Sequence, residues 1–321
     1  MAKIALAIHG GAGTILRSEM TDELEREYRT GLASALAEGW SILEKSGSAL
    51  DAVEAATISL EDFPLFNAGR GSVFTHEGKN EMDAALMDGH SLKAGAVAAV
   101  KNIKNPVSLA RLVMERTEHV MLAGAGANQF ALEMGIQSAD DAYFFTQHRY
   151  DQLLKAREKG LVELDHTAEE AGLLMDEKAS AVGTRPKGTV GAVACDATGF
   201  LAAATSTGGM TNKKYGRIGD TPLIGLGTYA DDLCAVSCTG YGEYFMLGVT
   251  AYDVSARMRY KRIPLVEAAN ESIDRLTEIK GDGGLIAVDT SGNITMPFNC
   301  DGMYRASIST GCQPDIRIYR S

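Results

Sequence analysis

The chain has 321 residues, of which 45% are hydrophobic, and it carries a formal net charge of −11 at pH 7. This length suffices for a large core in one domain or two, and the acidic charge argues against nucleic acid or an anionic membrane surface as partner. The opening apolar run Ile4–Ile8 is too short for a signal peptide, and no segment approaches the roughly 18–20 apolar residues that span a bilayer. We therefore expect a soluble, cytoplasmic protein.

The first half of the chain alternates helices with short strands that are bounded by glycine. Apolar residues recur at every fourth position from Leu24 to Trp40, which predicts a long helix beginning after Thr21. Further helices are expected after Ser48, which forms a capping-box pattern with Asp51, after the pair Asn105-Pro106, and over 147–158. Strands are expected over 4–8, 72–75, 95–100 and 119–122.

Residues 161–188 interrupt this regular pattern. The segment is rich in acidic residues and ends in Pro186-Lys187-Gly188, so we interpret it as a mobile linker, with an ordinary surface loop as the alternative. A strand expected over 190–195 follows almost at once. Further strands are expected over 200–205, 234–238, 285–288 and 294–296, with a tight turn at 196–199.

Histidines and cysteines lie on opposite sides of this linker. All six histidines precede Gly188 and all five cysteines follow it, without Cys-x-x-Cys spacing. We expect reduced, mostly buried thiols rather than a zinc site or disulfides. The segments 9–13 and 120–126 resemble a dinucleotide-binding turn, but Leu16 and Gln129 stand where its third glycine belongs, so no such cofactor is expected.

The segment that begins with Gly188-Thr189 suggests a nucleophile. A threonine hydroxyl needs a base, and no histidine is close in sequence. A free α-amino group titrates near 7.7–8.0, so Thr189 could activate its own hydroxyl if it were an amino terminus. That chemistry requires a cut between Gly188 and Thr189, and a glycine there tolerates the bent backbone of the attack.

Two later segments offer the other parts of a hydrolytic site. The segment 237–243 runs from a strand through glycines into a helix near Glu243, where backbone N–H groups can hold a developing negative charge; a plain strand-to-helix loop is the alternative. Arg217 and Asp220 lie in a glycine-rich loop and match the carboxylate and ammonium of an amino acid; a surface ion pair is the alternative.

Segments along nearly the whole chain resemble one known family. They are 8–13, 64–72, 82–89, 93–97, 188–191, 205–213, 216–223 and 238–240. In this order they are similar to the plant-type asparaginases, also called isoaspartyl peptidases, of the N-terminal-nucleophile hydrolase class. The activity implied is hydrolysis of L-asparagine and β-aspartyl dipeptides by an enzyme that cleaves its own chain.

The resemblance implies a role for each catalytic residue. Thr189 is the nucleophile, and Thr207 steadies its hydroxyl or amine. Thr239 and Gly240 form the oxyanion hole, with Gly240 also contacting the substrate. Asn67 lies near the reacting centre.

The resemblance also implies how the substrate is held. Arg217 grips the α-carboxylate, while Asp220 and the carbonyl of Gly242 bind the α-amino group. Gly10 and Gly11 form a close-packed loop beneath the site. No cofactor is needed for catalysis, but backbone carbonyls of a loop wrap a structural sodium ion. These are the carbonyls of Leu60, Glu61, Phe63, Phe66, Ala68 and Arg70.

The fold implied is a four-layer αββα sandwich, an α/β fold of the N-terminal-nucleophile type. Residues 1–188 would form an α subunit and 189–321 a β subunit of one structural domain, with two cleaved αβ pairs assembling as a dimer. Two other functions stay open. They are a glycosylasparaginase, which shares the nucleophile and the Arg-Asp clamp, and an uncleaved binding protein that kept only the fold.

Overall fold

The computed structural model describes residues 3–160, 162 and 188–320. The linker expected over 161–188 therefore lies outside the described residues, apart from Val162 and Gly188. None of the helices in the described ranges is long and apolar enough to cross a membrane.

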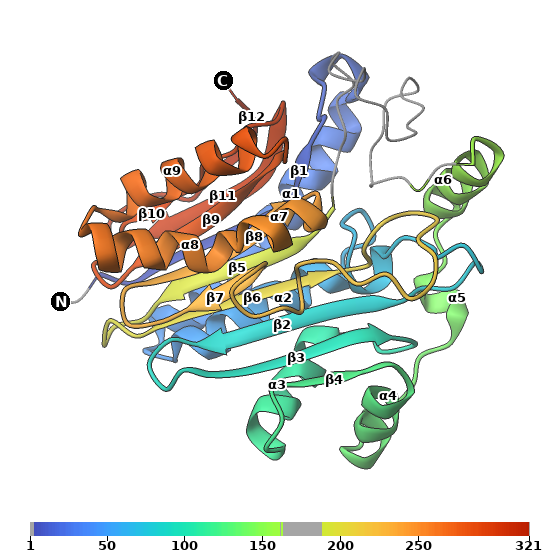
Figure 1. The fold of residues 1–321 in the computed structure, drawn as a ribbon, viewed down its shortest axis with the longest axis horizontal. Coiled ribbons are helices and arrows are strands. Elements are labelled where there is room, and N and C mark those ends of the chain that lie inside the picture. Colours follow the sequence, from blue (N-terminus) through green and yellow to red (C-terminus); the bar gives the residue numbers. More distant parts are fainter. Residues whose placement is uncertain (1–2, 161, 163–187, 321) are drawn as a thin grey trace.

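Strands from both halves of the chain form one eight-stranded sheet, called here the larger sheet, in the order β12-β11-β1-β5-β6-β2-β3-β4. Its strands are β1 (Ala5–Gly13), β2 (Met82–Asp88), β3 (Lys93–Val100), β4 (Met121–Ala123), β5 (Val190–Cys195), β6 (Leu201–Thr207), β11 (Gly302–Ser309) and β12 (Asp315–Tyr319). Neighbours pair antiparallel except β3 and β4, which are parallel. Because β1 lies between β11 and β5, and β2 next to β6, the two halves interleave (Figure 1).

A smaller four-stranded sheet has the order β10-β9-β8-β7 and comes entirely from the second half. Its strands are β7 (Thr228–Ala230), β8 (Cys234–Gly240), β9 (Gly283–Asp289) and β10 (Ile294–Thr295). Side chains of an extended strand alternate between its two faces, so a strand buried on both sides carries two apolar rows. This alternation assigns the core residues to separate clusters.

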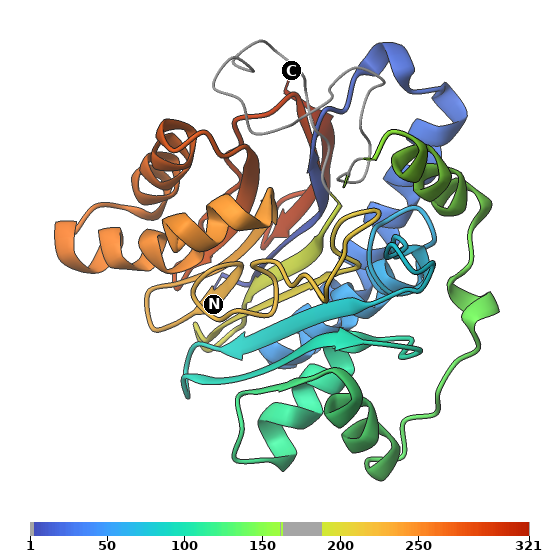
Figure 2. The ribbon, with the colours of Figure 1, turned by 45° about the vertical axis from the view of Figure 1, so that its right-hand side comes forward.

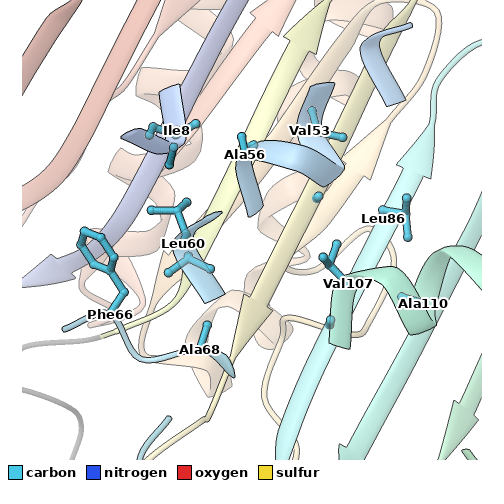
Figure 3. Packing of buried hydrophobic residues seen from close by; sticks show 14 of the residues in the cluster. Ile8, Val53, Ala56, Leu60, Phe66, Ala68, Leu86, Val107 and Ala110 are labelled. Carbon is cyan, nitrogen blue, oxygen red and sulfur yellow. The ribbon is translucent and has the colours of Figure 1, made fainter. Parts of the chain in front are cut away.

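The first apolar cluster joins the larger sheet to α1 (Asp22–Glu44), α2 (Ala49–Asp62) and α3 (Pro106–Arg116). Leu6 and Ile8 of β1 meet Val53 and Leu60 of α2 there, and all four side chains are fully buried. Figure 3 shows Ile8, Val53, Leu60 and neighbouring residues of this cluster. Burial of such a side chain contributes about 1.5–3 kcal/mol, so this face anchors the helices.

The opposite rows form two further clusters. Ala5 and Ala7 of β1 pack with Ile286 and Val288 of β9, which places the two sheets face to face. The outer face of the smaller sheet is covered by α7 (Gly242–Gly248), α8 (Thr250–Ala256) and α9 (Leu265–Glu278). Helices therefore flank the paired sheets on both outer sides (Figure 2).

The remaining helices lie at the edge of this core. They are α4 (Gly124–Glu133), α5 (Asp141–Phe144) and α6 (Gln147–Glu158), together with short helical turns at Arg17–Glu19, Gly69–Gly71 and Arg257–Lys261. The side chain of Arg149 in α6 is buried and donates hydrogen bonds to the carbonyls of Leu65 and Gly71, at 3.0 and 2.9 Å. This contact ties α6 to the loop that follows α2.

Helix starts that rest on capping chemistry are confirmed. The Thr21 hydroxyl accepts from the Leu24 N–H, and Ser48 accepts from the Asp51 N–H while donating to the Asp51 carboxylate. Such a cap stabilises a helix by about 1 kcal/mol. The starts of α3 and α6 are also where the sequence predicted them.

Two expectations are corrected by the structure. Residues 72–75 are not a strand, because the Val73 N–H donates to the Asn67 side chain at 2.9 Å instead of to a neighbouring strand. Gly10 and Gly11 are not in a loop but in β1, which has a bulge between His9 and Gly11. They are nevertheless close-packed, since a Cβ at Gly10 would lie 2.3 Å from the Phe66 ring.

Candidate active site

Thr189 stands immediately before β5 and is 7% exposed. Its hydroxyl donates to the Thr207 hydroxyl oxygen at 3.2 Å, and the Thr207 hydroxyl donates to the carbonyl oxygen of Gly188 at 3.1 Å. Thr207 is the last residue of β6, which pairs with β5, so the sheet register brings the two threonines together. A single hydroxyl thus links the expected nucleophile to the carbonyl that it would attack.

A second side chain holds the same carbonyl oxygen. The amide nitrogen of Asn67 donates to the Gly188 oxygen at 2.7 Å and to the Gly209 oxygen at 2.8 Å. The Asn67 side chain is itself fixed by the Val73 N–H. Gly208 has no room for a side chain, because a Cβ there would lie 2.4 Å from the Asn67 Oδ1. Two donors from separate elements therefore converge on the Gly188 oxygen.

A pocket opens beside these residues and brings most of the expected site together. It is small and partly open to solvent. Its lining residues are Gly188, Thr189, Thr207, Gly209, Met210, Arg217, Gly219, Asp220, Thr221, Gly240 and Gly242. The expected nucleophile and the expected amino-acid clamp thus face a common space.

The expected clamp is assembled around Gly242. A Cβ at Gly242 would lie 2.7 Å from the Asp220 Oδ1 and 2.9 Å from Arg217 Nη2, so only glycine leaves both groups in place. Asp220 is 5% exposed. A cation and an anion on adjacent walls of the pocket match the opposite charges of a zwitterionic amino acid.

Arg217 has a partner that the sequence did not predict. Its Nε and Nη2 donate to the two carboxylate oxygens of Glu243 at 2.9 and 2.7 Å. This bidentate geometry is the one that an arginine makes with a substrate carboxylate. Glu243 lies in the first turn of α7, and its side chain is 38% exposed, against 18% for that of Arg217.

Thr239 and Gly240 end β8 at the edge of the pocket. Gly240 lines the pocket, and a Cβ there would lie 2.1 Å from the Phe245 ring. Thr239 is fully buried, and its hydroxyl accepts from the Ala12 N–H at 3.3 Å. The strand end that was expected to form an oxyanion hole is therefore close to Thr189, the expected nucleophile, and the Thr239 hydroxyl contacts β1.

Two buried groups near the site have shifted pKa values. His9 is fully buried, and desolvation lowers its pKa to about 3 against a weaker opposing effect of its hydrogen bond to the Thr189 carbonyl. Burial also lowers the pKa of Lys213, whose ammonium donates to the Glu81 carbonyl at 2.8 Å. A Cβ at Gly209 would lie 2.9 Å from Lys213 Nζ, so this cation packs beneath the pocket wall.

The loop after α2 carries the carbonyls expected to hold sodium. A Cβ at Gly69 would lie 2.4 Å from the Glu61 oxygen, and one at Gly71 would lie 2.1 Å from the Phe66 oxygen, so glycine permits tight closure of the loop. The carbonyls of Phe66 and Ala68 accept backbone N–H groups of the loop, and each oxygen retains a second lone pair. An all-oxygen set of this kind suits a hard cation.

Comparison with known proteins identifies the family of the chain. A family model described as asparaginase matches residues 2–318. The chain belongs to this asparaginase family. Within it, the chain is 49% identical to an isoaspartyl peptidase of Escherichia coli K12 over 322 residues, covering 100% of this chain and 97% of the relative.

Other members of the asparaginase family match over similar lengths. A putative isoaspartyl peptidase/L-asparaginase of Dictyostelium discoideum is 47% identical, over 98% of this chain and 96% of the relative. A plant-type L-asparaginase of Pyrococcus furiosus is 43% identical, over 96% and 97%. The resemblance inferred from the sequence motifs is therefore confirmed.

Three side chains at the site were missed by the family-based reasoning. His9 and Ser237 contact each other across 228 positions of the sequence, and Glu243 reaches Arg217 across 26. The pattern of His9-Gly10-Gly11 marked the segment but not the role of the histidine. A carboxylate in the first turn of a helix is common for reasons of helix electrostatics, so Glu243 carried no distinct signal.

Proposed function

We propose that this chain is an isoaspartyl peptidase/L-asparaginase that cuts itself between Gly188 and Thr189 and then uses the freed Thr189 as nucleophile. The observation that carries the proposal is the contact series from the Thr189 hydroxyl through Thr207 to the Gly188 oxygen. It connects the hydroxyl that would attack with the carbonyl group that would be attacked, which belong to neighbouring residues. The names of the family relatives supply the substrates, which are isoaspartyl peptides and L-asparagine.

Self-cleavage begins when the Thr189 hydroxyl attacks the Gly188 carbonyl carbon. Negative charge develops on the Gly188 oxygen, to which Asn67 and Thr207 already donate hydrogen bonds. The C–N bond then breaks, and the proton lost by the hydroxyl is returned to the leaving nitrogen, which becomes the α-amine of Thr189. Water hydrolyses the ester that remains and frees the carboxylate of Gly188.

In the mature enzyme the α-amine of Thr189 is the base. It takes the hydroxyl proton as the oxygen attacks the side-chain carbonyl of asparagine or of a β-linked aspartyl residue. Thr239 and Gly240, at the end of β8, stabilise the oxyanion. The proton passes to the departing ammonia or peptide amine, and water then releases aspartate from the acyl-enzyme.

The substrate is held by its α-groups. Arg217 takes the α-carboxylate, while Asp220 and the Gly242 carbonyl take the α-ammonium. The shared packing of these three residues supports the assignment. The substrate carboxylate must displace Glu243 from the Nε and Nη2 edge of Arg217 or bind its remaining N–H groups.

Residues 1–188 and 189–321 form the α and β subunits of one structural domain. Interleaving of their strands in the larger sheet supports this, because β1 and β2 stay bonded to β5, β11 and β6 after the cut. The face-to-face sheets with outer helices are interpreted as the four-layer αββα sandwich of N-terminal-nucleophile hydrolases. The active form is a dimer of cleaved αβ pairs.

Catalysis needs no cofactor in this mechanism. A sodium ion would be held by carbonyl oxygens of the 60–70 loop, and its role would be to brace the loop that carries Asn67. The close approach of those carbonyls to Gly69 and Gly71 supports the assignment.

The test compares wild type with Thr189→Ala and Thr189→Ser on a denaturing gel and in hydrolysis of a β-aspartyl dipeptide. Wild type should give two bands and turnover, Thr189→Ser should keep both at reduced rates, and Thr189→Ala should give one band and no turnover. A single wild-type band without turnover would favour the uncleaved binding protein. Faster turnover of glycosylated asparagine than of the dipeptide would favour the glycosylasparaginase.

A further inference from the structure

A series of hydrogen bonds crosses the largely apolar space between the two sheets and runs from the nucleophile toward the substrate-binding loop. It begins at the Thr189 carbonyl and passes through the side chains of His9, Ser237 and Thr205 to Thr228, whose hydroxyl oxygen lies 3.1 Å from the Thr221 carbonyl oxygen. The consecutive distances from Thr189 to Thr228 are 2.9, 2.9, 2.7 and 2.6 Å. Thr221 follows Asp220, so the series ends beside the substrate-binding loop.

The sheet register explains how this polar series is accommodated. Gly191 of β5 lies between His9 of β1 and Thr205 of β6, and the three are direct cross-strand partners. The absence of a side chain at Gly191 leaves space for Ser237, which enters from β8 of the smaller sheet. A Cβ at Gly191 would lie 2.0 Å from Ser237 Oγ and 2.6 Å from His9 Nε2. The second glycine of the Gly188–Gly191 motif therefore makes room for the His9–Ser237 hydrogen bond.

The proton positions along the series follow from the end at Thr189. The Thr189 carbonyl can only accept, so His9 Nδ1 carries the proton and, in a neutral ring, Nε2 must accept from Ser237. Ser237 has only one hydroxyl proton, and it donates this proton to His9. In the short contact between the Ser237 and Thr205 hydroxyls, Thr205 must therefore be the donor. By the same reasoning Thr228 donates to Thr205. All the hydroxyl protons therefore point toward His9, and Thr228 has no proton left to donate to the Thr221 carbonyl.

We propose that His9 and Ser237 are positioning residues that hold the peptide plane of Thr189 in the mature enzyme. Self-cleavage frees Thr189 from Gly188, and the contacts of Asn67 and Thr207 with the Gly188 oxygen then no longer restrain Thr189. The His9 bond to the Thr189 carbonyl survives the cut. It keeps the amine and hydroxyl of the terminal residue aligned with the pocket. This inference rests on the proposed function.

A pair of substitutions at His9 separates its two hydrogen bonds. His9→Asn places an N–H near the position of Nδ1 and keeps the bond to Thr189, whereas His9→Gln extends toward Ser237 and loses it. Ser237→Ala removes the donor to His9 Nε2 without touching Thr189. Ser255→Ala is the matched control, because it removes another fully buried hydroxyl, that of Ser255 in α8, which donates to the Asp231 carboxylate.

Each variant is purified in cleaved form, and kcat and KM are measured on a β-aspartyl dipeptide. We expect His9→Gln to lose about 10- to 100-fold in kcat, Ser237→Ala to lose about tenfold, and both to keep KM within about twofold. His9→Asn should stay within about threefold of wild type, and Ser255→Ala should match it. Equal kcat values for His9→Gln and His9→Asn would overturn the inference, and so would wild-type kcat in Ser237→Ala.

Failure of the inference can be told apart from failure of the proposed function. If the wild-type protein does not cleave or turn over the dipeptide, the proposed function is wrong before any variant is compared. If wild type is active and the His9 and Ser237 variants match it, only the positioning role is wrong. Should the His9 variants fail to fold, Ser237→Ala decides the question alone.

Discussion

The Asn67 amide donates at 2.7 Å to the carbonyl oxygen of Gly188, in the peptide bond that joins Gly188 to Thr189, the proposed nucleophile. The same amide donates to the Gly209 oxygen at 2.8 Å, so its direction is set before any reaction begins. A donor fixed in this way stabilises an oxyanion without reorganising during the reaction. We therefore propose that Asn67 acts in self-cleavage.

Asn67→Asp should slow self-cleavage by about 100-fold, the usual cost of losing one oxyanion donor. Aspartate keeps an oxygen for the Val73 N–H but has no N–H for the Gly188 oxygen. The measurement is the precursor fraction against time on a denaturing gel. Asn80→Asp is the control, because Asn80 donates to the Ser72 and Val73 carbonyls of the same loop without contacting Gly188. Equal cleavage rates in the two variants would remove Asn67 from the mechanism.

Glu243→Gln should lower the KM for L-asparagine by about two- to fivefold. The Glu243 carboxylate occupies the edge of Arg217 that the proposed mechanism gives to the substrate carboxylate, and a partly exposed ion pair of this kind contributes about 0.2–1 kcal/mol. Arg217→Lys, which loses the planar two-pronged geometry, should raise KM. If Glu243→Gln instead raised KM, Glu243 would hold Arg217 in its binding position rather than compete for it.

Gly191→Ala should destabilise the fold by about 1–3 kcal/mol, the usual cost of overpacking. The new methyl group collides with Ser237 Oγ, so the double variant Gly191→Ala/Ser237→Ala should be less destabilised than the sum of the two single changes. Urea unfolding in the single-chain Thr189→Ala background measures all four forms. Strict additivity would contradict the close packing of Gly191 and Ser237.

Stability should fall as the pH drops below 6.5, with His9 as one cause. Its folded-state pKa of about 3 lies below the value of 6.5 for an unperturbed histidine. Between these values the unfolded chain binds a proton that the folded chain excludes. The free energy of unfolding therefore falls by up to about 1.4 kcal/mol for each pH unit as the pH drops between these two values. Above pH 6.5 His9 causes no such loss. Urea unfolding at several pH values in the Thr189→Ala background should show a shallower slope for His9→Asn, and equal slopes would contradict the buried neutral state of His9.

Local chemistry explains which elements the sequence predicted well. Helix starts could be predicted where a side chain or a proline ring favours them without any tertiary contact. These starts are at Thr21, Ser48 and the Asn105-Pro106 pair. Strand β2 was missed because Met82–Asp88 is buried on both faces and lacks apolar-polar alternation. Helix α9 was missed although its apolar residues recur at helical spacing, with Leu265, Ala269, Ile273 and Leu276 on the buried face.

In the candidate site, too, some residues could be predicted from the sequence and others could not. Thr189, Arg217 and Asp220 could be proposed from residue chemistry and family motifs, and the structure places all three around one pocket. The contact of His9 with Ser237 could not, because it depends on the packing of two sheets and on the space that Gly191 leaves for the Ser237 side chain. The spacing of His9 and Ser237 in the sequence carries no information about the distance between their side chains.

The most direct test of the central claim is the intact mass of the active protein under denaturing conditions, combined with sequencing of its amino termini. The account predicts two chains, residues 1–188 and 189–321, the second beginning at Thr189, with hydrolytic activity rising in step with their formation. Full activity in an intact 34.1 kDa chain with no amino terminus at Thr189 would contradict it.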